Sequence, residues 1–145
     1  MRAAGIIINA GNILLIHRFC NKKEYFVCPG GGVEEGESIE EAVIREIKEE
    51  TSLNAVIDKK LWEIADNFDG RIHHFYLLKN IQGIIKLGGI EAERNSENNQ
   101  YLLEWHKISE IKNLLIYPAE FKSSLISTFK NNETDKQFGS LAIRY

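Results

Sequence analysis

The chain is poor in cysteine, and this limits the classes of protein to which it can belong. Only two cysteines, Cys20 and Cys28, occur among its 145 residues. They can form at most one disulfide, and their spacing, without neighbouring Cys or His pairs, is not that of a zinc site. We interpret both as reduced thiols of a cytoplasmic protein, with Cys28 packed as a small apolar side chain.

Long apolar runs and an excess of positive charge are also missing. No apolar run approaches the ~20 residues that a membrane span requires, and the segment Gly5 to Leu15 is too weakly apolar for a signal peptide. The formal charge is −3, whereas a protein that binds nucleic-acid backbone needs a basic face. We therefore predict no membrane and no nucleic-acid partner. A small phosphorylated ligand, which needs only a local positive site, stays open.

What is present is an ordinary globular composition, with 43% hydrophobic and 27% charged residues. A chain of 145 residues suits one domain that buries about two-thirds of the surface of the unfolded chain. No internal repeat is visible. We predict a single domain over residues 1–130, followed by a polar linker and tail over 131–145 whose structure the sequence leaves open.

Apolar runs rich in Ile, Leu and Val predict strands along much of the chain. Ala3 to Asn9 and Ile13 to Arg18, on either side of Ala10-Gly11-Asn12, predict a β-hairpin. Glu24 to Cys28 predicts a further strand that leads into a run of glycines.

The later part of the chain adds a second hairpin and two helices. Asn54 to Ala65 and Arg71 to Leu78, joined by the turn signal Asp69-Gly70, predict the hairpin, which Ile81 to Ile85 can extend. Tyr101 to Ile108 predicts a strand, Ser109 is expected to cap a short helix, and Pro118 is expected to start a longer helix that reaches about Phe129. Strands mixed with two or three helices predict an α/β sandwich, in which helices cover both faces of a mixed sheet.

The most informative stretch runs from Pro29 to Leu53. Its first residues, Pro29-Gly30-Gly31-Gly32, carry almost no side chain, so this backbone can approach a ligand closely. Ser38 with Glu41 three residues later is typical of a capping box, and no Gly or Pro interrupts the following residues as far as Thr51. The stretch therefore predicts a glycine loop followed by a helix.

At about 100° per residue, this helix has one apolar arc, formed by Ile39, Ala42, Val43, Ile44 and Ile47. Glu46, Glu49 and Glu50 project into or beside that arc at i, i+3 and i+4 spacing, where their charges repel and are costly to desolvate. A hard cation such as Mg²⁺ resolves both problems. The alternative is an ordinary solvated surface helix, but this explains neither the positions of the glutamates nor the glycine loop.

The pattern Gly31-x5-Glu37-x7-Arg45-Glu46-Ile47-x-Glu49-Glu50-x-Ser52-Leu53 resembles the Nudix box of the Nudix hydrolases. One position departs, because Ser52 stands where the family usually has Gly to end the helix. The resemblance implies an α/β/α fold with the box helix packed on the sheet. It also implies cleavage of a phosphoanhydride bond in a nucleoside diphosphate linked to another group, with Mg²⁺ or Mn²⁺ and water.

The resemblance further implies roles for individual residues. Glu49 and Glu50 would be the main metal ligands, together with the backbone carbonyl of Gly30. Glu46 would bind a further ion or help to deprotonate water. Arg45 would hold Glu37 and a ligand glutamate in place, although it could instead be a solvated partner of Glu41 and Glu49.

Relatives often take a further carboxylate from a downstream loop. We predict that Glu97 is this base or ligand, with Glu91 and Glu93 as competitors. A solvated loop is the alternative for all three.

Substrate recognition is less well specified. Arg18 and Lys23, together with the backbone of Gly31 and Gly32, are the predicted substrate-binding groups, and Arg71, His73 and His74 are further candidates for phosphate contacts. His73 and His74 are adjacent on a predicted strand, so at most one of them faces a given pocket.

Subfamily markers act here by their absence. The Pro of ADP-ribose-type members, the Tyr of diadenosine-polyphosphate types and the coenzyme A signature are all missing from their places in this chain. What remains is the mutator-type group, which acts on nucleoside or deoxynucleoside triphosphates. A nucleotide-sugar hydrolase and a non-catalytic nucleotide sensor remain alternatives, and a homodimer stays open.

Overall fold

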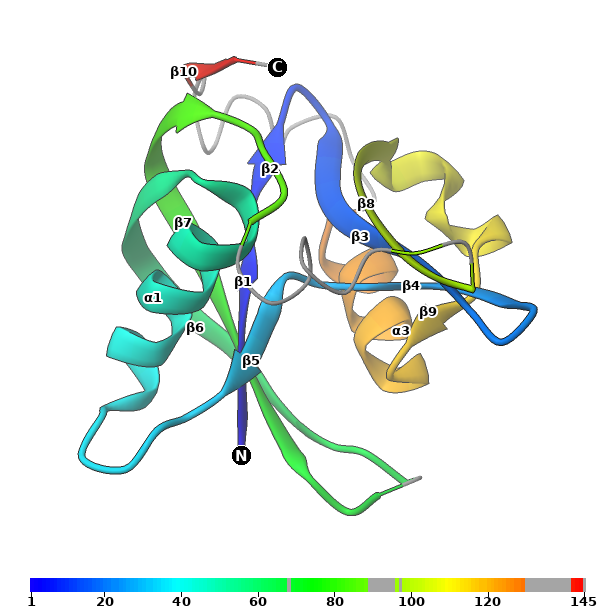
Figure 1. The fold of residues 1–145 in the computed structure, drawn as a ribbon, viewed down its shortest axis with the longest axis horizontal. Helices are drawn as coiled ribbons and strands as arrows, with labels where there is room; N and C mark the ends of the chain where they lie inside the picture. Colours follow the sequence, from blue (N-terminus) through cyan, green and yellow to red (C-terminus); the bar gives the residue numbers. More distant parts are fainter. Residues whose placement is uncertain (68, 89–95, 97, 130–141, 145) are drawn as a thin grey trace.

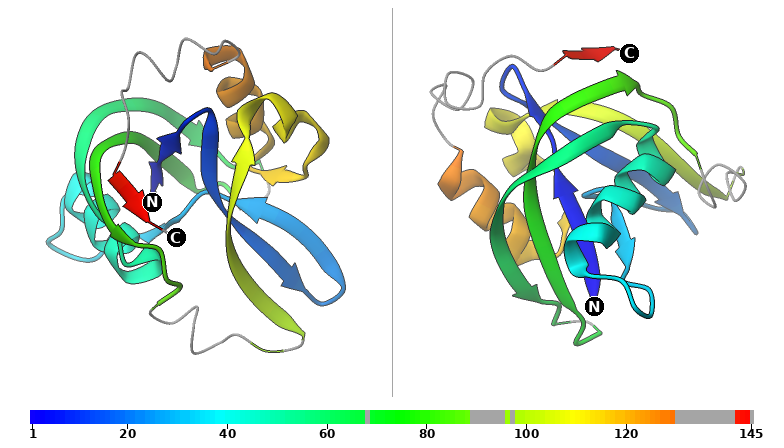
Figure 2. Two further views of the ribbon diagram at one scale, coloured as in Figure 1. Left: turned by 90° about the horizontal axis from the view of Figure 1, so that it is seen from above. Right: turned by 90° about the vertical axis from the view of Figure 1, so that its left-hand side faces the viewer.

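The computed structural model describes residues 1–67, 69–88, 96, 98–129 and 142–144 of the chain. Two mixed sheets of five strands each form the centre of the molecule, with helices on their outer sides (Figure 1; Figure 2). The first sheet contains β1 (Arg2–Ile6), β5 (Gly30–Gly32), β6 (Asn54–Ala65), β7 (Ile72–Ile84) and β10 (Ala142–Arg144). The second contains β2 (Ile8–Asn9), β3 (Asn12–Cys20), β4 (Lys23–Val27), β8 (Asn99–Lys107) and β9 (Ile116–Tyr117).

Two clusters of buried side chains hold the layers together. Alternate residues of β7 point to opposite faces of the first sheet, so that Tyr76 and Leu78 pack with helix α1 (Ile39–Thr51) while Phe75 and Leu77 face the second sheet. The second cluster is closed by Phe121 and Leu125 of helix α3 (Ala119–Thr128). The predicted α/β sandwich is confirmed, with the difference that its strands are divided between two sheets.

The first predicted hairpin is only partly correct. β2 pairs with β3 as expected, but β1 leaves that pairing and runs between β5 and β7, antiparallel to the first and parallel to the second. The reason is burial on both faces of β1: Ala3 packs on the α1 side and Ala4 on the other, and both are at most 1% exposed. A strand buried on both sides belongs at the centre of a sheet.

The second predicted hairpin is confirmed as β6 and β7, which pair antiparallel from Asn54 and Gln82 to Ala65 and Ile72. β7 runs on to Ile84, so the apolar residues after Leu78 do extend it. Of the predicted tail over 131–145, the described residues Ala142–Arg144 form β10, parallel to the end of β7.

The predicted cap at Ser109 is wrong. This residue lies inside a 3₁₀ helix, η1 (Ile108–Asn113), whose N-cap Lys107 makes no side-chain hydrogen bond. Ile108 and Ile111 are both buried, and their spacing of three matches the period of a 3₁₀ helix rather than that of an α-helix. Pro118 does precede α3, as its N-cap residue.

Candidate active site

The box helix α1 begins and ends as its sequence predicts. The amide of Glu41 donates to Ser38 Oγ over 3.0 Å, and the amide of Ser38 donates to Glu41 Oε1 over 3.2 Å, which completes the capping box. At the other end Ser52 adopts the left-handed conformation, with φ 65° and ψ 11°. The usual turn of the family is therefore present although Ser replaces Gly.

Arg45 gathers the acidic side chains of the box. Its Nε and Nη2 donate to the two carboxylate oxygens of Glu37 over 2.7 and 2.9 Å, and Nη1 donates to Glu46 over 2.9 Å and Glu49 over 3.2 Å. The hydrogen bond from Arg45 lowers the pKa of Glu37 to about 2, and Glu37 in turn raises the pKa of Arg45. Arg45 thus makes the contacts that the family resemblance implied.

The glycine loop receives the carboxylates of the helix. Glu50 is only 2% exposed, and its Oε1 accepts a hydrogen bond of 2.7 Å from the Gly30 amide. A Cβ on Gly31 would lie 2.3 Å from Glu46 Oε1, so this carboxylate lies against bare backbone. The carbonyl oxygen of Gly32 accepts from Arg45 Nη2 over 2.9 Å. Glycine at position 31 thus leaves room for the Glu46 carboxylate, which any larger residue there would displace.

The donor set of the box suits a hard divalent cation. Glu46 and Glu49 both bind Nη1 of Arg45, and their side chains are 13% and 50% exposed. Glu50 is held at the loop from the same helix face. Carboxylate oxygens and backbone carbonyls are the ligands that Mg²⁺ and Mn²⁺ prefer. The residues present therefore fit the metal that the family resemblance implies.

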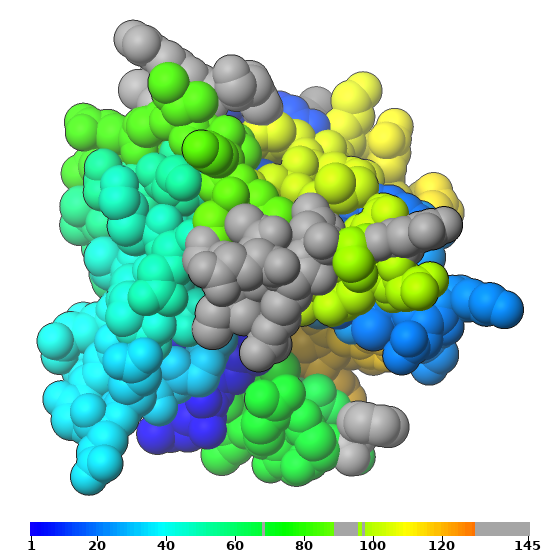
Figure 3. Space-filling model, in the orientation of Figure 1, coloured from blue at the N-terminus to red at the C-terminus, as the bar shows by residue number. Residues whose placement is uncertain are grey.

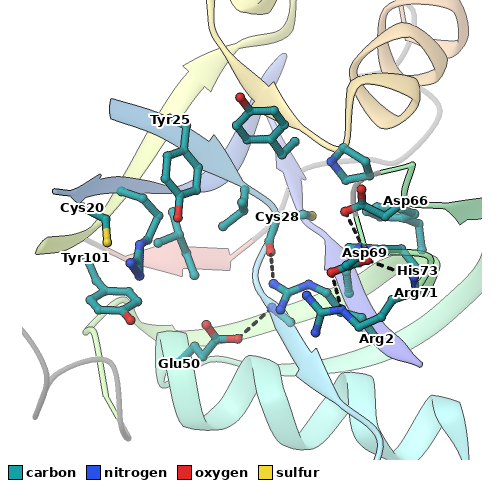
Figure 4. A pocket seen from close by; sticks show the side chains of 18 of the residues that line it. Arg2, Cys20, Tyr25, Cys28, Glu50, Asp66, Asp69, Arg71, His73 and Tyr101 are labelled. Carbon is teal, nitrogen blue, oxygen red and sulfur yellow. Dashed lines mark hydrogen bonds and ion pairs between the residues drawn. The ribbon is translucent and has the colours of Figure 1, made fainter. Parts of the chain in front are cut away.

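A pocket of about 650 Å³ lies between the two sheets, and Glu50 and Gly30 line one of its walls (Figure 4). In the space-filling view, the box stretch and the β6–β7 turn lie on either side of the start of β1 (Figure 3). Of the predicted substrate-binding groups, Arg18 and Lys23 line this pocket, whereas Gly31 and Gly32 are not among its lining residues.

One end of the pocket is aromatic. The guanidinium carbon of Arg18 lies 3.6 Å from the ring centroid of Tyr101 and 5.9 Å from that of Tyr25. Nη2 of Arg18 also donates to Asn99 Oδ1 over 2.8 Å, and Tyr25 meets Tyr117 edge to face at 5.5 Å. This wall offers flat rings and a fixed positive charge.

The other end carries charged and polar side chains from β1, from the turn between β6 and β7, and from the start of β7: Arg2, Asp66, Asp69, Arg71 and His73 (Figure 4). Nη2 of Arg2 donates to the Cys28 carbonyl over 3.2 Å. Burial and the nearby Arg2 lower the pKa of His73. His73 lines the pocket and His74 does not, in agreement with their alternation along the strand.

Sequence reasoning overlooked several of these lining residues. Arg2 and Ala4 both line the pocket at i, i+2 spacing, and Tyr101 does so from β8. The alternation of β1 could have revealed Arg2 if its central position had been recognised. Cys28 lies in the core as expected, where burial raises the pKa of its thiol.

The predicted downstream base cannot be placed. Glu97 and its competitors Glu91 and Glu93 lie outside the described residues.

Among the described helices, none is both long and apolar enough to cross a bilayer.

Known proteins resemble this chain at the levels of family, sequence and fold. A family model of the NUDIX domain matches residues 1–127. Over 102 residues the chain is 60% identical to the ADP-ribose pyrophosphatase of Methanocaldococcus jannaschii. This match covers 66% of this chain and 60% of that protein. Over 84 residues it is 36% identical to the RNA pyrophosphohydrolase of Pelagibacter ubique. That match covers 57% of this chain and 49% of that protein. The matches thus span less than two-thirds of either relative.

Solved structures of other proteins also resemble the fold of this chain. A structure from a study of MutT from Aliivibrio salmonicida and Vibrio cholerae is 27% identical, with a TM-score of 0.68 over 88% of this chain and 97% of its own. The Escherichia coli ORF135 protein is 25% identical, with a TM-score of 0.64 over 86% of this chain and 84% of its own. With a box whose glutamates meet a glycine loop, and a NUDIX match over most of its length, the chain belongs to the Nudix hydrolase family.

Proposed function

We propose that this protein hydrolyses a phosphoanhydride bond in a nucleoside diphosphate derivative, with Mg²⁺ or Mn²⁺ as cofactor. The observation that carries the proposal is the cluster around Arg45. This residue binds Glu37, in the loop before α1, together with Glu46 and Glu49 of the helix, and the same helix sends Glu50 to the wall of the pocket. Such an arrangement concentrates negative charge at one place beside a cavity. Phosphoryl chemistry needs this arrangement for metal binding.

In this proposal Glu46, Glu49 and Glu50, with the Gly30 backbone, hold the metal. The bound metal supplies charge neutralisation at the phosphate oxygens and a lower pKa for water. Arg45 orients the carboxylates through its planar fork, and its hydrogen bond lowers the pKa of Glu37. Glu97 remains our prediction for the base that takes the proton from water, and Glu46 is the alternative within the box.

The protein's own cations bind the substrate. Arg18 and Lys23 line the pocket on the side of the second sheet, and Arg2 and Arg71 line it from the first. We propose that they hold phosphate oxygens, while Tyr25 and Tyr101 offer ring faces to a base. Gly31 and Gly32 stay predicted as backbone contacts at the edge of the site.

Two substrate classes have specific support. The 60% identity to a protein named ADP-ribose pyrophosphatase favours a nucleoside diphosphate linked to a sugar. The likeness to MutT and the missing ADP-ribose-type Pro favour nucleoside or deoxynucleoside triphosphates, which would be cleaved to monophosphate and pyrophosphate. A cytoplasmic location and a homodimer remain predictions.

A substrate panel tests the proposal. ADP-ribose, nucleotide sugars and the common nucleoside and deoxynucleoside triphosphates are incubated with Mg²⁺, and all products are identified. Release of AMP and ribose 5-phosphate from ADP-ribose would select the first class, and release of pyrophosphate would select the second. Binding of nucleotides without turnover of any member would refute catalysis and leave the sensor alternative.

A further inference from the structure

The turn between β6 and β7 brings together three side chains that can bind a metal ion. Asp66 follows the end of β6, Asp69 lies in the turn, and His73 is near the start of β7. Each offers one ligand atom, and these atoms all lie within 4.8 Å of one another. Among the described residues, no other group of three such side chains comes so close together, and this group lies apart from the carboxylates of the box.

Backbone hydrogen bonds fix the positions of the two aspartates. The Asp66 amide donates to the Arg71 carbonyl and the Gly70 amide donates to the Asp66 carbonyl, each over 2.8 Å. The Asp69 carboxylate accepts from the Arg71 amide over 2.9 Å and from Arg71 Nε over 2.7 Å. Because a carboxylate has about four lone-pair sites, Asp69 can bind Arg71 and still ligate an ion.

His73 provides the second and independent sign of a ligand. The residue is only 5% exposed, and its buried Nε2 makes no hydrogen bond within the described part of the structure. Nε2 instead points toward the aspartates, 3.4 Å from Oδ2 of Asp66 (Figure 4). A buried polar nitrogen without a hydrogen bond is costly. A metal ion between the ring and the aspartates would satisfy it.

The neighbouring His74 shows what the alternative looks like. It is also 5% exposed, and its Nδ1 lies 3.5 Å from Glu63 Oε1. It faces a single carboxylate, however, and belongs to no group of three ligating side chains among the described residues. It also does not line the pocket. His74 and Glu63 therefore form a matched control on the opposite face of the same strand.

We propose that Asp66, Asp69 and His73 form a second divalent-metal site, separate from the Nudix box and suited to a transition ion such as Zn²⁺. One imidazole and two carboxylates are a donor set that favours Zn²⁺ over Mg²⁺. Since all three residues line the pocket, water or an anionic group of a bound ligand can complete the coordination. The proposal does not depend on hydrolysis by the box.

Direct titration of the whole chain with Zn²⁺ tests this site. We use a Glu46→Gln/Glu49→Gln variant as the parent, because the loss of two carboxylates should weaken any metal binding by the box, and measure Zn²⁺ by calorimetry and Co²⁺ by visible absorption. The parent should bind about one equivalent of Zn²⁺. Adding Asp66→Asn should weaken binding at least tenfold, roughly the smallest effect expected for a ligand, and adding Glu63→Gln should not.

His73→Gln should have the same effect as Asp66→Asn. If the buried His73 variant fails to fold, Asp66→Asn still decides, because Asp66 is only partly buried. Absence of Zn²⁺ binding in the parent would overturn the site. Equal affinity in the parent and Asp66→Asn would do so too, as would an equal loss in Glu63→Gln. None of these results bears on whether the box hydrolyses nucleotides.

Discussion

Arginine at position 45 is matched to its surroundings by shape as well as charge. Its guanidinium meets Glu37 with two nitrogens and reaches Glu46 and Glu49 with a third. A lysine would keep the charge but not the planar fork. Because the folded chain favours the ionised form of Glu37 more strongly than the unfolded chain does, this contact also makes stability depend on pH.

We predict that Arg45→Lys raises the pKa of Glu37 from about 2 toward its usual value of 4.5. A carboxyl group with a depressed pKa adds stability above its unfolded pKa and loses it as the pH falls through the folded one. The wild-type protein should therefore lose stability between about pH 4.5 and pH 2, with a shallower slope in Arg45→Lys. Carboxyl NMR titration and acid unfolding measure both. A Glu37 pKa that stays near 2 would contradict the role of Arg45, and Lys48→Arg on the same helix is the control.

Glu50 is the buried member of the box, and its replacement separates charge from packing. Gln at this position can still accept the hydrogen bond from the Gly30 amide. We predict that Glu50→Gln lowers the rate of hydrolysis by roughly 10²–10³, while stability without metal holds or rises, because repulsion among the carboxylates falls. Steady-state kinetics and thermal melting check this. Full activity in Glu50→Gln, or in excess chelator, would refute the proposed site. Glu40→Gln, exposed in the first turn, is the control.

At the scale of elements, β5 and α1 approach each other so closely that a single methyl group matters. A Cβ on Gly31 would meet the Glu46 carboxylate, whereas a Cβ on Gly32 would meet nothing within 4 Å. The atom in the way is the end of a flexible side chain, so the fold can adapt. The position of Glu46 cannot be kept.

We therefore predict that Gly31→Ala lowers kcat by roughly 10–100-fold, as expected for a displacement of about 1 Å in a catalytic group. Its melting temperature should stay close to that of the wild type. Gly32→Ala, one residue along, should retain activity. If both variants behave alike, the contact between Gly31 and Glu46 has no role in turnover.

The end of α1 offers a test of backbone strain. Ser52 has φ 65°, which costs an L-residue energy, but its hydroxyl donates to the Lys86 carbonyl over 2.9 Å. Ser52→Gly relieves the strain and loses the hydrogen bond, whereas Ser52→Ala loses the bond and keeps the strain. We predict that the Gly variant is more stable than the Ala variant by about 1 kcal/mol. Against the wild type, the Gly variant should gain less than this. Chemical denaturation measures the order, and an Ala variant as stable as the Gly variant would contradict it.

At the scale of the whole molecule, both sheets contribute to one pocket, so a ligand there connects them. A non-hydrolysable nucleoside diphosphate analogue should stabilise the folded chain by about 2.7 kcal/mol at 100 times its Kd. Arg18→Gln removes the cation that stacks on Tyr101, so the thermal shift at equal ligand concentration should be smaller. An undiminished shift would mean that the ligand binds elsewhere, and Lys107→Gln, exposed at the end of β8, is the control.

Local signals predicted the local structure well. The capping box, the strands β6 and β7, and the contact between Arg45 and Glu37 all rest on short-range spacing or on the family box, and the structure has them. The central position of β1 could not be predicted in this way, because its partner β7 lies some seventy residues later in the chain. Arg2 was missed for the same reason. The sequence indicated a turn at Asp69 and gave no role to Asp66, and only the hairpin register places the two beside His73.

The passage from β1 to β2 has a mechanical consequence. Ile7 alone separates the two strands, is fully buried, and accepts a hydrogen bond from the Leu14 amide. One continuous stretch of backbone thus belongs to both sheets, with no loop between them. The two walls of the pocket should therefore not move independently, so we expect the width of the cavity to stay nearly constant. Ligands would then be selected by their width, and only side chains at the edge of the pocket would adjust to them.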